Sequence, residues 1–162
     1  MSNVSPIPEG CNSVNIYLVV KDGQAAIDFY CKAFDATGGM CMPGPDGKGI
    51  MHAEIQIGNS TIMLSEENPQ WGATSAETMG GSPASLHLYL PNVDATFQQA
   101  VDAGCTVVAP LMDTFWGDRY GKVADPFGYQ WGLATHVEDV SEEEMGKRAA
   151  QWFAQAAESG EG

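Results

Sequence analysis

The sequence predicts an α+β fold in which a strand–helix–three-strand module occurs twice and a further helix follows. Apolar runs of strand type and stripes of helical period alternate in the same order in both halves of the 162-residue chain. The two predicted helices also end alike, in Phe34-Asp35-Ala36 and in Val101-Asp102-Ala103. Such a repeat is typical of a duplicated unit whose copies pack together. The two modules together give eight strands, which are enough to curl into a half-barrel with a concave face.

The first module is predicted to span residues 12–66. Its helix carries an apolar stripe at helical spacing, and its strands are rich in β-branched and aromatic residues. The predicted elements are a strand at 14–20, a helix at 24–34, and strands at 40–42, 50–57 and 61–65. Gly38-Gly39 is expected to end the helix, and Gly58-Asn59 fits a tight hairpin turn between the last two strands.

A polar linker is predicted at residues 67–83, and the second module at 84–136. The linker contains Pro, Gly, Ser and Thr throughout. The second module is predicted to have a strand at 85–90, a helix at 95–103, and strands at 106–108, 122–124 and 129–135. A loop is expected at 110–120. Asp125-Pro126-Phe127-Gly128 has the residues of a type I turn before the last strand.

Residues 137–162 are predicted to form an acidic helix and tail. Ser141 and Glu144 match a capping box at the start of a helix over 142–157. The apolar stripe of this helix consists of Met145, Ala149, Trp152, Phe153 and Ala156. The stripe either packs on the chain's own sheet or helices or forms a contact between two copies, and the pattern leaves both interpretations open.

Charge and cysteine usage exclude several classes of partner. The net charge of −14 repels phosphate backbones and anionic lipid, so we expect neither nucleic acid nor membrane as a partner. No apolar run approaches the roughly 18 residues that span a bilayer. The four cysteines are scattered without a Cys-x-x-Cys pair, which favours reduced thiols in the cytoplasm over disulfides or a zinc site.

Each predicted strand has an aliphatic face, which must bury against the helices, and a second face that carries polar and aromatic groups. This mixture suits a concave binding pocket better than a solvated surface. A solvated face remains the alternative, because many antiparallel sheets expose one face to water. The polar face and the loop near 115–120 supply the expected ligand-binding residues: Asn15, Tyr17, His52, Glu54, Met63, Ser85, His87, Trp116 and Arg119. Arg119 either anchors an anionic group or pairs with a nearby Asp. Trp131 is expected in the core.

Several short motifs, in this order and spacing, resemble the PhnB-like branch of the vicinal oxygen chelate (glyoxalase/bleomycin resistance/dioxygenase) superfamily. They are Asp28-Phe29-Tyr30, His52-Ala53-Glu54, Ile62-Met63-Leu64-Ser65, Val93-Asp94-Ala95-Thr96, the run from Phe115 to Gly121, Asp125-Pro126-Phe127-Gly128, Trp131, the run from Leu133 to His136, and the run from Glu138 to Ser141. The resemblance implies two βαβββ modules that form a U-shaped mixed sheet around a central cavity, and it implies a homodimer. Many members hold a divalent metal there, whereas others only bind and sequester small molecules.

The resemblance places the metal ligands of such enzymes at Asn15, Met63, Ser85 and Gly132. None offers the imidazole or carboxylate that a divalent first-row metal prefers, so we expect no metal and no other cofactor. His52, Glu54 and His87 are the candidate catalytic residues, as acid–base groups or as a displaced metal site. Three hypotheses follow: a metal-free binding protein for an unidentified small molecule; an enzyme of lyase, isomerase or dioxygenase type; and an interaction role through the acidic tail.

Overall fold

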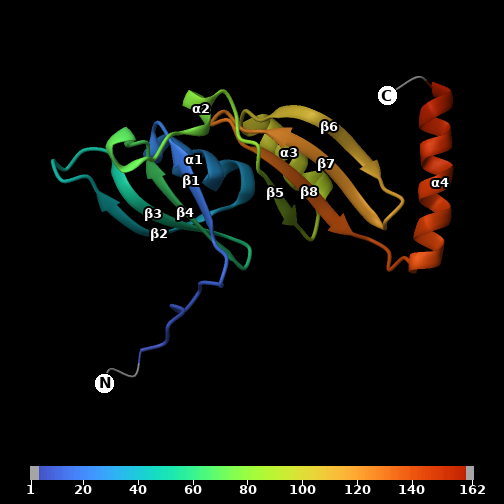
Figure 1. Cartoon of the computed structure of the whole chain (residues 1–162), viewed down its shortest axis with the longest axis horizontal. Coiled ribbons are helices and arrows are strands. Elements are labelled where there is room, and N and C mark those ends of the chain that lie inside the picture. The colour runs from blue at the N-terminus through green and yellow to red at the C-terminus, as the bar shows by residue number, and fades with distance from the viewer. Residues whose placement is uncertain (1–3, 160–162) are drawn as a thin grey trace.

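The computed structural model describes residues 4–159 and contains the duplicated module (Figure 1). The first copy consists of β1 (Ile16–Val20), α1 (Gly23–Phe34), β2 (Thr37–Pro43), β3 (Ile50–Ile57) and β4 (Ser60–Glu66). The second consists of β5 (Ser85–Tyr89), α3 (Val93–Ala103), β6 (Thr106–Asp113), β7 (Asp118–Ala124) and β8 (Gln130–His136). The α+β class and the repeated module are therefore confirmed.

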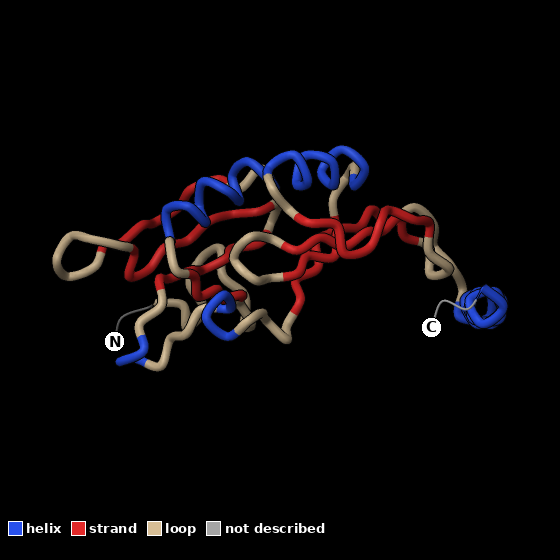
Figure 2. The backbone as a smooth tube through the Cα atoms, turned by 90° about the horizontal axis from the view of Figure 1, so that it is seen from above, coloured by secondary structure: helices blue, strands red, loops and turns tan. Residues whose placement is uncertain are grey.

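The eight strands form two mixed sheets of four, ordered β1-β4-β3-β2 and β5-β8-β7-β6. In each sheet the first strand pairs in parallel with the last strand of its module, and the remaining pairs are antiparallel. No strand pairing within residues 4–159 joins the two sheets. The helices α1 and α3 lie next to each other on one side of the strands (Figure 2).

The aliphatic strand faces bury against the two helices, as the alternation predicts. Fully or almost fully buried side chains come from both sheets: Leu18, Val20, Ile55, Ile62, Leu64, Val123, Trp131 and Leu133. Trp131 is in the core, as expected. Between the helices, Gln99 Nε2 donates hydrogen bonds to the Lys32 carbonyl (2.8 Å) and to Asp35 Oδ1 (2.9 Å).

A buried carboxylate connects the two modules. Asp125, in the turn before β8, accepts hydrogen bonds from Tyr30 Oη and Trp131 Nε1 (both 2.8 Å) and from the backbone N–H groups of Phe127 and Tyr129 (both 2.9 Å). Burial raises the pKa of Asp125, and these hydrogen bonds oppose that effect. Since Tyr30 belongs to α1, this one side chain joins the turn of the second module to the helix of the first.

Tyr129, in the same turn, makes a second link between the modules. Its hydroxyl accepts from the Val19 N–H (3.0 Å) and donates to the Val19 carbonyl (2.9 Å), so it satisfies both backbone groups of a β1 residue. The Asp125-Pro126-Phe127-Gly128 turn, which positions Tyr129, therefore helps to hold β1 in place. The strand β1 carries part of the candidate site.

Four elements differ from the sequence-based expectation, and one of them is β7, which begins at Asp118, inside the loop predicted at 110–120. The strand β2 begins at Thr37, because Gly38 and Gly39 continue into the strand through a register shift rather than ending at a turn. The strand β6 runs on to Asp113 through Pro110, which an edge strand tolerates because its N–H side need not pair. The polar linker contains the 3₁₀ helix η1 (Pro69–Trp71) and the short helix α2 (Ala76–Met79).

The C-terminal helix α4 (Glu142–Ser159) stands away from the two sheets at the end of the second module (Figures 1 and 2). Trp152 and Phe153 approach the ring of Phe115, with centroid distances of 6.0 and 6.3 Å, and Arg148 donates to both oxygens of Glu138 at 2.8 Å. Through these two aromatic residues the apolar stripe contacts the β6–β7 loop. None of the described helices is long and apolar enough to cross a membrane.

Candidate functional site

Three polar side chains form a connected row on the polar face of the first sheet. Tyr17 Oη lies 3.1 Å from His52 Nδ1, and His52 Nε2 lies 3.4 Å from Glu54 Oε1. Tyr17 and Glu54 both lie opposite Met63, one on each side of β4, so the sheet register places the phenol and the carboxylate two strands apart on one face. The imidazole bridges the distance between them.

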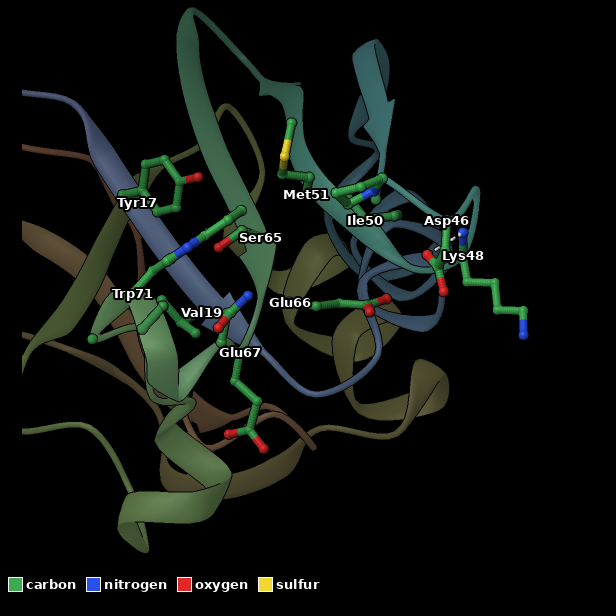
Figure 3. Close-up of a pocket in the computed structure, with 15 residues that line it drawn as sticks. Tyr17, Val19, Asp46, Lys48, Ile50, Met51, Ser65, Glu66, Glu67 and Trp71 are labelled. Atoms are coloured by element: carbon green, nitrogen blue, oxygen red, sulfur yellow. Dashed lines mark hydrogen bonds between the residues drawn. The ribbon is translucent and has the colours of Figure 1, made fainter.

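One member of the row, Tyr17, also lines a pocket of about 480 Å³ between the sheet face, the β2–β3 loop and the linker (Figure 3). Tyr17, Met51, Ser65 and Trp71 line it together with parts of both loops. Figure 3 shows the Tyr17 hydroxyl pointing toward the side of the pocket that holds Ser65 and Met51. The pocket lies within the first module, rather than between the sheets of the two modules.

Ser65 is the buried polar group of this pocket. The residue is 7% exposed; its hydroxyl forms no hydrogen bond with another described residue, and its Oγ is open to the pocket rather than fully buried. Trp71, at the end of η1, is 66% exposed and also lines the pocket. A free hydroxyl at the base and an aromatic ring at the rim are groups that recognise a planar or apolar molecule with one polar substituent.

Carboxylates dominate the charge at the pocket mouth. Glu66 Oε1 accepts from the N–H of Gly23 at the start of α1 (3.0 Å), and Glu67 Oε2 accepts from Ser75 and Thr78. The hydrogen bonds from Ser75, followed by those from Thr78, lower the pKa of Glu67. Asp46 also lines the mouth, with Lys48 as its cationic neighbour. The mouth therefore disfavours anionic ligands.

The polar face of the second sheet carries a separate aromatic group. His87 stacks on Tyr120 with ring centroids 5.8 Å apart, and it contacts Tyr89 at 4.8 Å. A Cβ at Gly132 would lie 3.0 Å from both rings of the stacked pair, so this glycine lets the pair lie flat on β8. The structure thus brings His52 and Glu54 together with Tyr17, but it places His87 on the other sheet.

Asp118, at the start of β7, is the centre of a cluster that sequence reasoning missed. It is 2% exposed and accepts hydrogen bonds from Tyr89 Oη (3.0 Å), Trp116 Nε1 (2.9 Å) and His136 Nδ1 (2.8 Å). Burial acts to raise the pKa of Asp118, but these hydrogen bonds outweigh it and the pKa is lowered. The only sequence signal was the Trp-Gly-Asp order, in which a polar residue follows a tight turn.

Three predicted ligand-binding residues have protein partners. Arg119 Nη2 donates to Asp94 (2.9 Å) and Nη1 to Asp113 (3.3 Å), which corresponds to the Asp-pairing interpretation rather than the anion anchor. The Asn15 side chain is bonded to the Asn12 backbone, and Trp116 to Asp118. Ser85 is exposed at the start of β5.

A model of the Glyoxalase/Bleomycin resistance protein/Dioxygenase superfamily matches residues 12–133. The chain belongs to this superfamily. Two mycobacterial relatives are each 48% identical over 132 residues, or 80% of this chain. They are Uncharacterized protein Mb0911c of Mycobacterium bovis, of which the match covers 86%, and Uncharacterized protein Rv0887c of Mycobacterium tuberculosis, of which it covers 77%.

Solved structures agree with this superfamily fold. TioX from Micromonospora sp. ML1 superposes with a TM-score of 0.60 at 23% identity, covering 78% of this chain and all of TioX. The Arabidopsis thaliana gene product AT5G48480 superposes with a TM-score of 0.61 at 24% identity. The match covers 76% of this chain and 98% of the Arabidopsis chain. At these identities the likeness shows the shared fold.

The residues of this superfamily member do not fit the metal site that the resemblance implies. Asn15 and Met63 belong to the first module, Ser85 and Gly132 to the second, and none supplies an imidazole or a carboxylate. Across residues 4–159, no cluster of three or more His, Cys, Asp or Glu side chains could hold a metal ion. His52, Glu54 and His87 therefore do not form a displaced metal site within one chain.

Proposed function

We propose that this superfamily member binds a small, uncharged or weakly charged molecule in the pocket of its first module, without a metal. The observation that carries the proposal is the pocket of about 480 Å³, a size typical of small-molecule sites, with the aromatic side chains of Tyr17 and Trp71 and the hydroxyl of Ser65 in its lining. The acidic mouth supports exclusion of anions.

Binding of the neutral fluorescent amine N-phenyl-1-naphthylamine tests this proposal. We expect its fluorescence to rise on titration with the protein, and W71A to weaken the apparent affinity about tenfold, because an aromatic wall contributes roughly 1.5 kcal/mol. W152A is the matched control, since Trp152 is also exposed but lies on α4, outside the pocket. Equal loss in both variants, or no binding by the native protein, would contradict the pocket assignment. Chelator should leave the affinity unchanged.

We infer that the protein acts as a homodimer, in keeping with its superfamily. Support comes from the outermost strand of each sheet. Every residue of β2 is exposed, including Met40 and Met42, and β6 exposes Val108 and Met112. Apolar side chains on unpaired outer strands favour a protein partner over water.

Light scattering after size-exclusion chromatography is expected to give about twice the 17.2 kDa chain mass. M42D should shift the protein toward monomer, whereas M79D, at an exposed methionine on α2, should not. A chain truncated after His136 tests the tail: retained dimers would exclude α4 as the interface. A native mass of one chain at all concentrations would overturn the inference.

We also propose that the protein belongs to the PhnB-like branch and works in the cytoplasm. The fold likeness to a PhnB protein from Bacillus cereus, with a TM-score of 0.60 at 15% identity, supports the branch, as do the motifs around His52 and Phe115. The four free cysteines, Cys11, Cys31, Cys41 and Cys105, support a reducing compartment.

A further inference from the structure

The row formed by Glu54, His52 and Tyr17 has a defined hydrogen-bond direction. An ionised carboxylate can only accept, so Glu54 requires a proton on His52 Nε2. In the neutral imidazole, Nδ1 then carries a lone pair and must accept from Tyr17 Oη. The Tyr17 proton is committed to His52, which leaves the phenol oxygen as an acceptor.

This oxygen faces the pocket, because Tyr17 is 49% exposed and is one of the lining residues (Figure 3). Ser65 lies on the same face two residues beyond Met63, the residue opposite Tyr17. A ligand that donates a hydrogen bond to Tyr17 can therefore also bond the free Ser65 hydroxyl. The Tyr17 oxygen and the Ser65 hydroxyl together favour a ligand whose hydrogen-bond donor lies within reach of both.

Resting on the proposed pocket, we propose that Tyr17 is a proton acceptor that binds molecules with an acidic hydroxyl, of the phenol or enol class, and relays their proton to His52. The ligand O–H bond breaks as its proton joins Tyr17 Oη, and the Tyr17 O–H bond breaks as that proton joins His52 Nδ1. The products are the ligand anion and an imidazolium that Glu54 stabilises. Charge and protons balance, and no oxidant or cofactor takes part.

The surroundings of His52 favour this direction of transfer. The groups that face the ring are Glu54 from its own strand, Tyr17 from β1, Met42 from β2, and Met63 and Ser65 from β4. Within residues 4–159, Glu54 is the charged group that pairs with the imidazole. The charges of the pocket mouth, Asp46, Lys48, Glu66 and Glu67, make no ion pair or hydrogen bond with His52.

The relay has a pH dependence with a fixed sign. When His52 is protonated, both ring nitrogens are donors, so Nδ1–H donates to Tyr17 and the Tyr17 proton turns toward the pocket. Tyr17 then loses its role as acceptor. Binding of an acidic hydroxyl through Tyr17 should therefore fall as His52 becomes protonated, whereas binding of an ether or carbonyl should not.

The test compares 4-nitrophenol with 4-nitroanisole, its methyl ether, which has no proton to donate. At a pH where the phenol is still protonated in solution, we expect the native protein to prefer it to the ether at least about tenfold, the worth of one hydrogen bond to a polarised group. The bound phenol should show the phenolate absorbance band below its solution pKa. Tyr17→Phe and His52→Gln should both abolish the preference and the band, while the exposed His87→Gln on the other sheet should keep them.

The outcomes separate the relay from the pocket. Equal binding of phenol and ether by the native protein, or a preference that survives Tyr17→Phe, would overturn the relay while N-phenyl-1-naphthylamine binding still supports the pocket. If neither nitro compound binds but the amine does, hydroxyl recognition is wrong. If the amine does not bind either, the pocket proposal itself fails. Unchanged far-UV circular dichroism of each variant shows that it is folded.

Discussion

D125A should lower the free energy of unfolding by about 4 kcal/mol. The substitution leaves four donors without an acceptor, from Tyr30, Trp131 and the backbone of Phe127 and Tyr129, in a region that water does not reach. Each unsatisfied buried donor costs roughly 1–3 kcal/mol, and partial relaxation reduces the sum. Urea unfolding followed by tryptophan fluorescence measures the effect.

Asp102→Ala is the matched control for Asp125. Asp102 also accepts a hydrogen bond, from Gln98 Nε2 at 2.8 Å, but it lies exposed on α3, so its loss should cost no more than about 0.5 kcal/mol. A loss at Asp125 as small as that of the control would mean that the four donors find other partners. Because Tyr30 belongs to the first module, we also expect D125A to broaden the unfolding transition as the two modules lose coupling.

D118A should cost about 2 kcal/mol, less than D125A despite similar burial of the carboxylate. Its donors are freer to find water, since Tyr89 is 63% exposed and the side chain of His136 is half exposed. The Trp116 ring is also 36% exposed, so its Nε1 can reach water when the carboxylate is removed. Thermal unfolding of D118A beside the exposed-site variant Asp113→Ala measures the difference.

The cost of D118A should also depend on pH. Hydrogen bonds to Asp118 and Asp139 raise the pKa of His136, so this stabilisation is complete below the unfolded histidine pKa and is lost as pH rises through the folded one. The lowered pKa of Asp118 adds stability above the unfolded aspartate pKa, and that is lost as pH falls through the folded value. The difference between D118A and the native protein should therefore peak between about pH 4 and pH 6.5. A difference that does not change with pH would contradict the charge pairing.

Periodicity and turn chemistry predicted most of the fold, for identifiable reasons. The alternation in β3 buries Ala53, Ile55 and Ile57 and leaves His52 and Glu54 on the other face, as expected. The misjudged strand bounds involve Gly38, Gly39 and Pro110, residues whose local preference for turns is overridden by pairing with β3 and β7. Local sequence does not encode such pairing.

The candidate site was only partly predictable. The alternation of side chains along each strand placed Tyr17, His52 and Glu54 on the polar faces. The 3.1 Å contact between Tyr17 and His52, however, depends on the parallel pairing of β1 with β4. Trp71 and Ser65 were missed because one lies in a polar linker and the other resembles an ordinary strand serine. Their role depends on how the linker returns over the sheet, a tertiary arrangement without a local signal.

The parallel pairing of β1 with β4 also has a consequence for synthesis on the ribosome. The first strand of each module finds its partner only when the last strand of that module has emerged, so neither sheet can close gradually from its N-terminal end. The first module contains all four of its strands by Glu66, well before the second is translated. The hydrogen bonds of Tyr30 to Asp125 and of Val19 to Tyr129 can form only after the second module has been synthesised. We therefore expect nascent chains to hold an early, loosely packed half that becomes rigid only after the second half is made.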